Sequence, residues 1–333
     1  MPEVELFSPG SLGTCWYGKY HYLEPWVGCE HNCPYCYSRS RISVRESLRK
    51  HGTKFDCPIP LLPPEQLLRA IDKEANSGLI NIVKLSRYTD IFTPQFVQNG
   101  LSHAILEVLA KSKVKRIIIT TKGLPSSEII RLMTDNAAKF SYNAAFRPSG
   151  LLPESPLAAF DSHLHPIEER LQAAQQIQSG GCLTTIHCDP FVAGIDDAPE
   201  ALYPFLELLK KYHLNRVMWS YLLFSPGIME EVRRAVPAAD LDKILSRYNT
   251  ETGRQVLPNQ EDTISWAQNN ETALKSVDTV AQALIAGGFQ FVLCSLKSIK
   301  GLDLSKYPRT MLCDGQFYAS TLHPHCRRGS SLR

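Results

Sequence analysis

The chain has 333 residues, of which 44% are hydrophobic and 21% are charged, and its formal net charge is +3. This length suits one large α/β domain or two smaller ones with a substantial core. No apolar run approaches the length needed to span a bilayer, and so small a net charge neither requires nor excludes a nucleic-acid partner.

The N-terminus and the cysteine content indicate the compartment. Residues 1–10 carry Glu3 and Glu5 and lack an apolar segment, so they predict no signal peptide and a cytoplasmic protein without membrane contact. The sequence has ten cysteines. In a cytosolic enzyme, clustered cysteines are typical of metal or cluster ligands rather than of disulfides.

Strand and helix patterns alternate through the first two thirds of the chain. Strands are predicted at 20–27, 81–85, 114–121, 140–146, 183–187 and 216–221. Helices are predicted between them at 65–77, 99–112, 126–138, 166–179 and 199–212. The run Arg116–Thr121 is rich in β-branched residues, as in a parallel strand that is buried on both faces. This alternation predicts right-handed βαβ crossovers and a parallel sheet.

The pattern is looser after residue 221. Helices are predicted at 228–236, 241–248 and 270–286, a loop at 249–261 and a strand at 289–296. A basic stretch comes earlier, at residues 38–50, where the charges suit a solvated helix face or a surface for an anionic substrate. Its basic side chains are Arg39, Arg41, Arg45, Arg49 and Lys50.

The most specific motif is a set of three cysteines directly after the first predicted strand. Cys29, Cys33 and Cys36 have the spacing C-x3-C-x2-C. Three thiolates this close together hold three corners of an iron–sulfur cube and leave the fourth iron open for a small molecule. A structural zinc site is the alternative, with His31 as fourth ligand, but that spacing is cramped for four tetrahedral ligands from one loop.

With Tyr35 before the last cysteine, this motif resembles the signature of the radical S-adenosylmethionine superfamily. The resemblance implies an α/β fold, a partial (β/α)6 TIM-like barrel with a C-terminal α/β extension. The barrel core would occupy residues 15–225, and residues 226–333 would pack on it. The implied cofactors are a 4Fe-4S cluster and S-adenosylmethionine. Cleavage of the cofactor by one electron gives a 5'-deoxyadenosyl radical, which abstracts hydrogen from a substrate.

A finer resemblance connects the chain to the spore photoproduct lyase group, which includes the DNA repair photolyase-like proteins. The segment 28–37 is similar to the G-C-x-H-x-C-x-Y-C-Y of that group. Further similar segments are Thr89-Asp90 with Pro94, Thr121-Lys122, Phe140-Ser141-Tyr142-Asn143, Glu169-Arg170 and Asp189-Pro190. The resemblance covers roughly residues 20 to 225.

The resemblance also implies roles for individual residues. Cys29, Cys33 and Cys36 would hold the cluster. The predicted cofactor-binding residues are Tyr35, Thr89, Asp90, Lys122, Ser141, Asn143, Arg170 and Asp189. The polar residues among them that end strands, together with His187, fall where functional groups collect on parallel sheets. Tyr35, Tyr37 and Tyr88 are the predicted catalytic residues. Tyr88 stands where the lyase keeps its hydrogen-donating cysteine, and this difference argues against thymine-dimer repair.

Three interpretations of the function follow. The first is a radical S-adenosylmethionine enzyme that acts on a nucleobase or nucleic acid and takes its electron from a reductant such as flavodoxin or ferredoxin. The second is the same chemistry on a peptide or small metabolite. The third is a non-catalytic zinc or iron–sulfur module that binds nucleic acid through its basic stretch. An auxiliary metal site is a further hypothesis for Cys294, Cys313, His323, His325 and Cys326.

Overall fold

The computed structural model describes residues 5–10, 20–249, 254–255, 264–294, 299 and 302–307. Within these residues the largest sheet has eight strands in the order β1-β2-β5-β6-β7-β8-β9-β12. They are β1 (Phe7–Pro9), β2 (His21–Leu23), β5 (Ile82–Leu85), β6 (Arg116–Thr121), β7 (Phe140–Ala145), β8 (Leu183–Phe191), β9 (Arg216–Tyr221) and β12 (Gln290–Leu293). Within this sheet only β1 and β2 pair antiparallel, and the other neighbouring strands are parallel. The predicted parallel α/β sheet is confirmed, and its strand order suits a partial TIM-like barrel.

The first predicted strand, 20–27, is divided in two. Strand β2 ends before Pro25, whose nitrogen carries no hydrogen for a sheet ladder. The chain then forms β3 (Trp26–Val27), which pairs antiparallel with β4 (Ile59–Pro60) outside the large sheet. The cysteine loop therefore follows a short second ribbon rather than the sheet strand itself.

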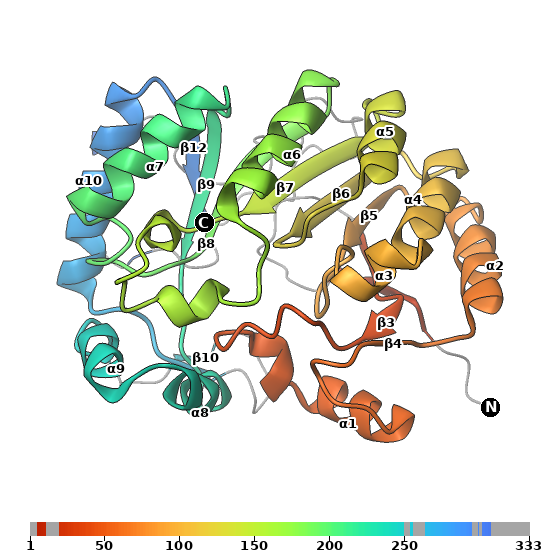
Figure 1. The fold of residues 1–333 in the computed structure, drawn as a ribbon, viewed down its shortest axis with the longest axis horizontal. Helices are drawn as coiled ribbons and strands as arrows, with labels where there is room; N and C mark the ends of the chain where they lie inside the picture. Colours follow the sequence, from red (N-terminus) through yellow and green to blue (C-terminus); the bar gives the residue numbers. More distant parts are fainter. Residues whose placement is uncertain are drawn as a thin grey trace.

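Ten helices are described, and five of them match the helices predicted between the strands. They are α1 (Ile42–His51), α2 (Pro64–Ala75), α3 (Pro94–Gln98), α4 (Leu101–Lys111), α5 (Ser127–Asp135), α6 (Ile167–Ser179), α7 (Pro199–Lys211), α8 (Pro226–Ala235), α9 (Ala238–Leu245) and α10 (Asn270–Ala286). Helices α4, α5 and α6 lie side by side along the sheet, whereas α1, α8 and α9 lie together at the other end of the molecule (Figure 1). A 3-10 turn, Tyr37–Ser40, joins the cysteine loop to α1.

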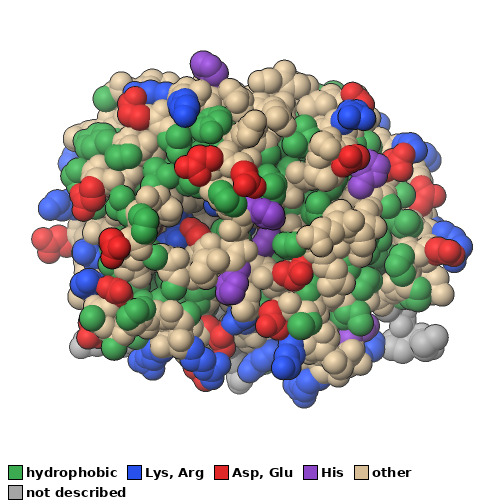
Figure 2. Space-filling view, in the orientation of Figure 1, with side chains coloured by type: hydrophobic (Ala, Val, Ile, Leu, Met, Phe, Trp, Pro, Cys, Tyr) green, Lys and Arg blue, Asp and Glu red, His purple; other side chains and the backbone are tan. Residues whose placement is uncertain are grey.

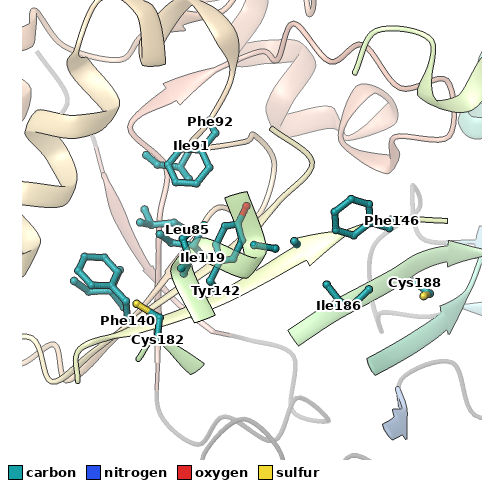
Figure 3. Packing of buried hydrophobic residues seen from close by; sticks show 14 of the residues in the cluster. Leu85, Ile91, Phe92, Ile119, Phe140, Tyr142, Phe146, Cys182, Ile186 and Cys188 are labelled. Atoms are coloured by element: carbon teal, nitrogen blue, oxygen red, sulfur yellow. The ribbon is translucent and has the colours of Figure 1, made fainter. Parts of the chain in front are cut away.

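The core between sheet and helices is built from alternate residues of the central strands. Leu85 of β5, Ile119 of β6, Tyr142 of β7 and Ile186 of β8 belong to one buried cluster (Figure 3). Each such side chain contributes about 1.5–3 kcal/mol of transfer free energy when it is fully buried. Since side chains alternate across a strand, the intervening residues, such as Asn143, face the other side of the sheet.

The C-terminal part adds to the same sheet. Helix α10 leads into β12, which pairs in parallel with β9, so the predicted extension 226–333 contributes one more βα unit. The division of domains at residue 225 stays a prediction. Residues 254–255, predicted as loop, form β10 (Arg254–Gln255) and pair with β11 (Ile264–Ser265). The hypothetical auxiliary ligands Cys313, His323, His325 and Cys326 lie outside the described residues.

One face of the molecule carries a row of basic side chains at its edge (Figure 2). Lys and Arg side chains gather along the lower edge of the view, where α1 and α8 lie (Figure 2). Arg45 and Arg49 of α1 are exposed. Arg39 instead forms an ion pair with Glu231 of α8 at 2.5 Å, so it connects the 3-10 turn before α1 to α8. None of the described helices is long and apolar enough to cross a bilayer.

Candidate active site

A cavity of about 380 Å³ lies at the carboxyl ends of the parallel strands. All three cysteines of the loop line it, and so do residues at the ends of β6 and β8 and residues that follow β5 and β9. This volume falls in the range of small-molecule sites. The carboxyl edge of a parallel sheet is also where ligands bind in α/β folds, so this cavity is the candidate active site.

The cysteine loop is held against its surroundings by its own main chain. Gly28 has a φ of +89°, and a Cβ there would lie 2.7 Å from the carbonyl oxygen of Phe55. The Cys29 N–H donates to that same oxygen at 2.6 Å. On the other side, the Glu30 carboxylate accepts a hydrogen bond at 2.6 Å from the Gln95 N–H in the first turn of α3. The loop is therefore fixed before any cofactor binds.

The thiols of this loop differ in burial. Cys29 and Cys33 are buried and Cys36 is half-buried. Burial raises the pKa of Cys33 to about 11, although the nearby Lys122 acts to lower it. Among the described side chains, no three His, Cys, Asp or Glu converge closely enough to hold a single metal ion. Buried thiols that face one cavity from separate points fit a cluster, whose cysteines bind different iron atoms.

Asp90 braces the floor of the cavity. Its carboxylate accepts hydrogen bonds from the Thr121 hydroxyl at 2.6 Å and the Lys122 N–H at 2.8 Å, and it lies 3.4 Å from His31 Nε2. Burial alone would raise the pKa of Asp90, but His31 and these hydrogen bonds lower it to about 2. Asp90 thereby connects the cysteine loop to the ends of β5 and β6. That it also binds the cofactor stays a prediction.

Tyr35 is packed into the wall of the cavity. Its ring lies 4.9 Å from that of Phe160, and Lys122 Nζ lies 5.5 Å above its centroid. Its hydroxyl donates to Asp161 at 3.5 Å. Arg147 in turn binds Asp161 at 2.7 Å. This pair of buried Arg147 and half-buried Asp161 was not predicted from the sequence, and it connects the segment after β7 to the cysteine loop.

Tyr37 and Tyr88 lie close together at the mouth of the cavity. Their ring centroids are 6.1 Å apart. The Tyr37 hydroxyl donates to the carbonyl oxygen of Arg87. The Glu24 carboxylate accepts hydrogen bonds from the N–H groups of Arg87 and Tyr88 and from the Thr89 hydroxyl. The loop that carries Tyr88 is thus held from both sides.

Glu24 was also missed by the sequence analysis. The only sequence signal is an acid placed between two apolar strands, directly before Pro25. Its partners lie more than sixty residues further along the chain, so their proximity emerges only in the folded sheet. Burial raises the pKa of Glu24 to about 7, against the opposing effect of its hydrogen bonds.

The remaining predicted residues divide into two groups. Lys122 and Asp189 line the cavity with the tyrosines and cysteines. Ser141, Asn143 and Arg170 are buried and do not appear among the described lining residues. Arg170 donates to the carbonyl oxygen of Ala145 at 2.9 Å and to that of Lys122 at 3.4 Å, so it braces the ends of β6 and β7. Cofactor binding by these three stays a prediction.

We expect Glu24 to make stability depend on pH. The folded chain holds its proton up to about pH 7, whereas the unfolded chain releases it near the ordinary value of 4.5. Stability should therefore fall as pH rises through this interval. Glu24→Gln, which cannot titrate, should gain on the order of 2 kcal/mol relative to the unsubstituted chain between about pH 5 and about pH 8. Urea unfolding across this range measures the difference.

The matched control is Glu65→Gln, because the Glu65 side chain is 89% exposed on α2. Its stability should run parallel to that of the unsubstituted chain at every pH. If the Glu24→Gln curve also runs parallel, Glu24 does not titrate in this interval and the argument from its burial is wrong.

Known proteins were compared with this chain in sequence and in fold. No family model and no curated protein matches the sequence. The chain is similar in fold to spore photoproduct lyase. A mutant of that lyase with bound AdoMet and dinucleoside spore photoproduct aligns with a TM-score of 0.59 and 13% identity, over 82% of this chain and 75% of the lyase. Another mutant aligns with a TM-score of 0.62 and 13% identity, over 88% and 79%. The predicted resemblance is therefore confirmed for the fold.

Proposed function

We propose that this chain is a radical S-adenosylmethionine enzyme. The observation that carries the proposal is the placement of Cys29, Cys33 and Cys36 on one cavity at the carboxyl edge of a parallel sheet. The similar fold of the lyase, which was crystallised with AdoMet, supports it. A 4Fe-4S cluster on these cysteines would supply the electron that cleaves S-adenosylmethionine to methionine and a 5'-deoxyadenosyl radical.

Different residues of the chain would bind different groups of this cofactor. Lys122 lies beside the cysteines, and Cys33 and Asp189 raise its pKa against the effect of burial. As a cation in the wall of the cavity, it would hold the cofactor carboxylate. Asp189 lies in the same wall and would accept hydrogen bonds from ribose hydroxyls. Asp90 would act indirectly, since its oxygens already hold Thr121 and the Lys122 main chain.

The substrate would enter beside Tyr88. This residue is half-buried in the wall of the cavity next to Tyr37, so its hydroxyl would be available to return hydrogen to a product radical. A nucleobase or nucleic acid is the substrate that the similar lyase suggests. A peptide or small metabolite is the alternative, because it would use the same cysteines and the same lysine.

The decisive test is anaerobic reconstitution with iron and sulfide, followed by reduction in the presence of S-adenosylmethionine. We expect the visible absorbance of an iron–sulfur cluster and formation of 5'-deoxyadenosine, with dithionite, reduced flavodoxin or reduced ferredoxin as the electron donor. A reconstituted, reduced protein that forms no 5'-deoxyadenosine would falsify the proposal. If such a protein still bound nucleic acid with a steep salt dependence, it would instead be a binding module that uses Arg45 and Arg49.

A further inference from the structure

Arg87 is held at the mouth of the cavity by its main chain. It is the second residue after β5, is half-buried, and lines the cavity. Its N–H donates to the Glu24 carboxylate and its carbonyl oxygen accepts from the Tyr37 hydroxyl. With both main-chain groups bonded, the start of the Arg87 side chain has a fixed position and direction.

The guanidinium of Arg87 is held in turn by two aromatic rings. Its Cζ lies 4.8 Å from the ring centroid of Tyr88 and 5.5 Å from that of Tyr22. Each such contact contributes about 0.5–1 kcal/mol at an exposed site. Rings on the faces of a guanidinium leave its edge, which carries the N–H donors, available to a ligand.

Within the described part of the chain, Arg87 makes no ion pair, because no carboxylate there lies within ion-pair distance of its guanidinium. Glu24 attracts Arg87, but the Glu24 oxygens already accept hydrogen bonds from the loop main chain and from Thr89. Lys84 brings a second positive charge to the same Tyr22 ring, at 5.9 Å from its centroid.

The described residues that line the cavity include more basic than acidic side chains. Its charged lining residues are Arg41, Lys84, Arg87 and Lys122 on the basic side, and Asp90 and Asp189 on the acidic side. The described lining thus carries four positive and two negative side chains, and Asp90 is already bonded to Thr121 and the Lys122 main chain. A cleft lined by one sign of charge concentrates ligands of the opposite sign.

We propose that Arg87 anchors an anionic group, a phosphate or a carboxylate, of the molecule on which this cavity acts. An arginine fork matches either group with two parallel hydrogen bonds. The cofactor also has a carboxylate, but Lys122, which lies beside the cysteines, is the residue proposed to bind it. Arg87 lies instead against Tyr22 and Tyr88. The anion is therefore that of the substrate, and it lies next to Tyr88. That this ligand is a substrate rests on the proposed function, whereas the anion-binding role of Arg87 does not.

Ligand-detected NMR can test this anchor without turnover. The probes are methylphosphonate for a phosphate group, acetate for a carboxylate, and acetamide as a neutral control. We expect saturation transfer to the methyl protons of one or both anions and none to acetamide, in the as-isolated and in the reconstituted protein alike. The anion that binds more tightly identifies the class of substrate. Arg87→Gln should weaken that binding by about tenfold or more.

The matched control is Arg131→Gln, because Arg131 is an exposed arginine of α5 that does not line the cavity. It should bind the probes as the unsubstituted chain does. Circular dichroism checks that both variants are folded. Equal weakening in both variants, or no weakening in Arg87→Gln, overturns the assignment. If the protein forms no 5'-deoxyadenosine but still binds the anions, the proposed function is wrong and the assignment of Arg87 as an anion-binding residue remains.

Chemical modification of the unsubstituted chain provides a test that needs no variant. Phenylglyoxal modifies accessible arginines, and peptide mass spectrometry locates the product. Methylphosphonate or acetate should slow the modification of Arg87 and leave that of Arg131 unchanged. Protection of Arg87 by S-adenosylmethionine but by neither anion would mean that Arg87 serves the cofactor, and the proposal would be wrong.

Discussion

Cys33→Ala should abolish both cluster binding and cofactor cleavage. After anaerobic reconstitution, the unsubstituted chain should hold about four iron atoms, and the variant should lose the characteristic visible absorbance. The reason is that Cys33, which is 6% exposed on the cavity wall, is one of only three proposed cysteine ligands of the cluster. Iron analysis and chromatography of 5'-deoxyadenosine measure the two losses.

Cys57→Ala is the matched control for this experiment. Cys57 lies in the segment that packs beside the cysteine loop, but its side chain is exposed and does not line the cavity. Its removal should leave the iron content and the yield of 5'-deoxyadenosine unchanged. Should Cys33→Ala keep its turnover, or Cys57→Ala lose iron to the same degree, the cluster is not held as proposed.

Much of the sheet could be predicted from local pattern alone. The β-branched run of β6 and the amphipathic helices around it indicate their structure within a few residues of sequence. The split of the first strand was missed, since Pro25 lies in a run that is mainly aromatic and apolar. The pairing of β12 with β9 was also missed, because the two strands are separated by α8, α9 and α10, and no local pattern specifies such a partner.

The candidate site was predictable to the extent that its motif is local. Three cysteines within eight residues indicate their chemistry from their spacing. Arg170 shows the limit of such inference. Its guanidinium donates to the carbonyl oxygens of Ala145 and Lys122, contacts that no local pattern specifies, and its binding of the cofactor stays a prediction. The residues that brace the site, Glu24 and Arg147, have partners that become neighbours only in the folded chain.

Arg147→Met should cause the largest loss of stability among single substitutions near the site. Arg147 is 2% exposed, and it binds the Asp161 carboxylate at 2.7 Å and the Leu157 carbonyl oxygen at 3.0 Å. Its guanidinium also lies 4.9 Å from the ring centroid of Phe160. The variant leaves Asp161, whose side chain is 19% exposed, without its cation, so the loss should be about 3 kcal/mol, the lower end of the range for a buried pair. Urea unfolding of each variant measures this loss.

Two further variants separate the ion pair from other effects. Arg131→Met, on the exposed face of α5, should change stability by less than about 0.5 kcal/mol. The double variant Arg147→Met with Asp161→Leu should recover part of the loss, because it leaves no unpaired carboxylate. A double variant no more stable than Arg147→Met would show that packing against Phe160, rather than the charge pair, dominates. Because Tyr35 hydrogen-bonds to Asp161, both Arg147 variants should also loosen the cysteine loop, measurable as faster hydrogen exchange at its amides.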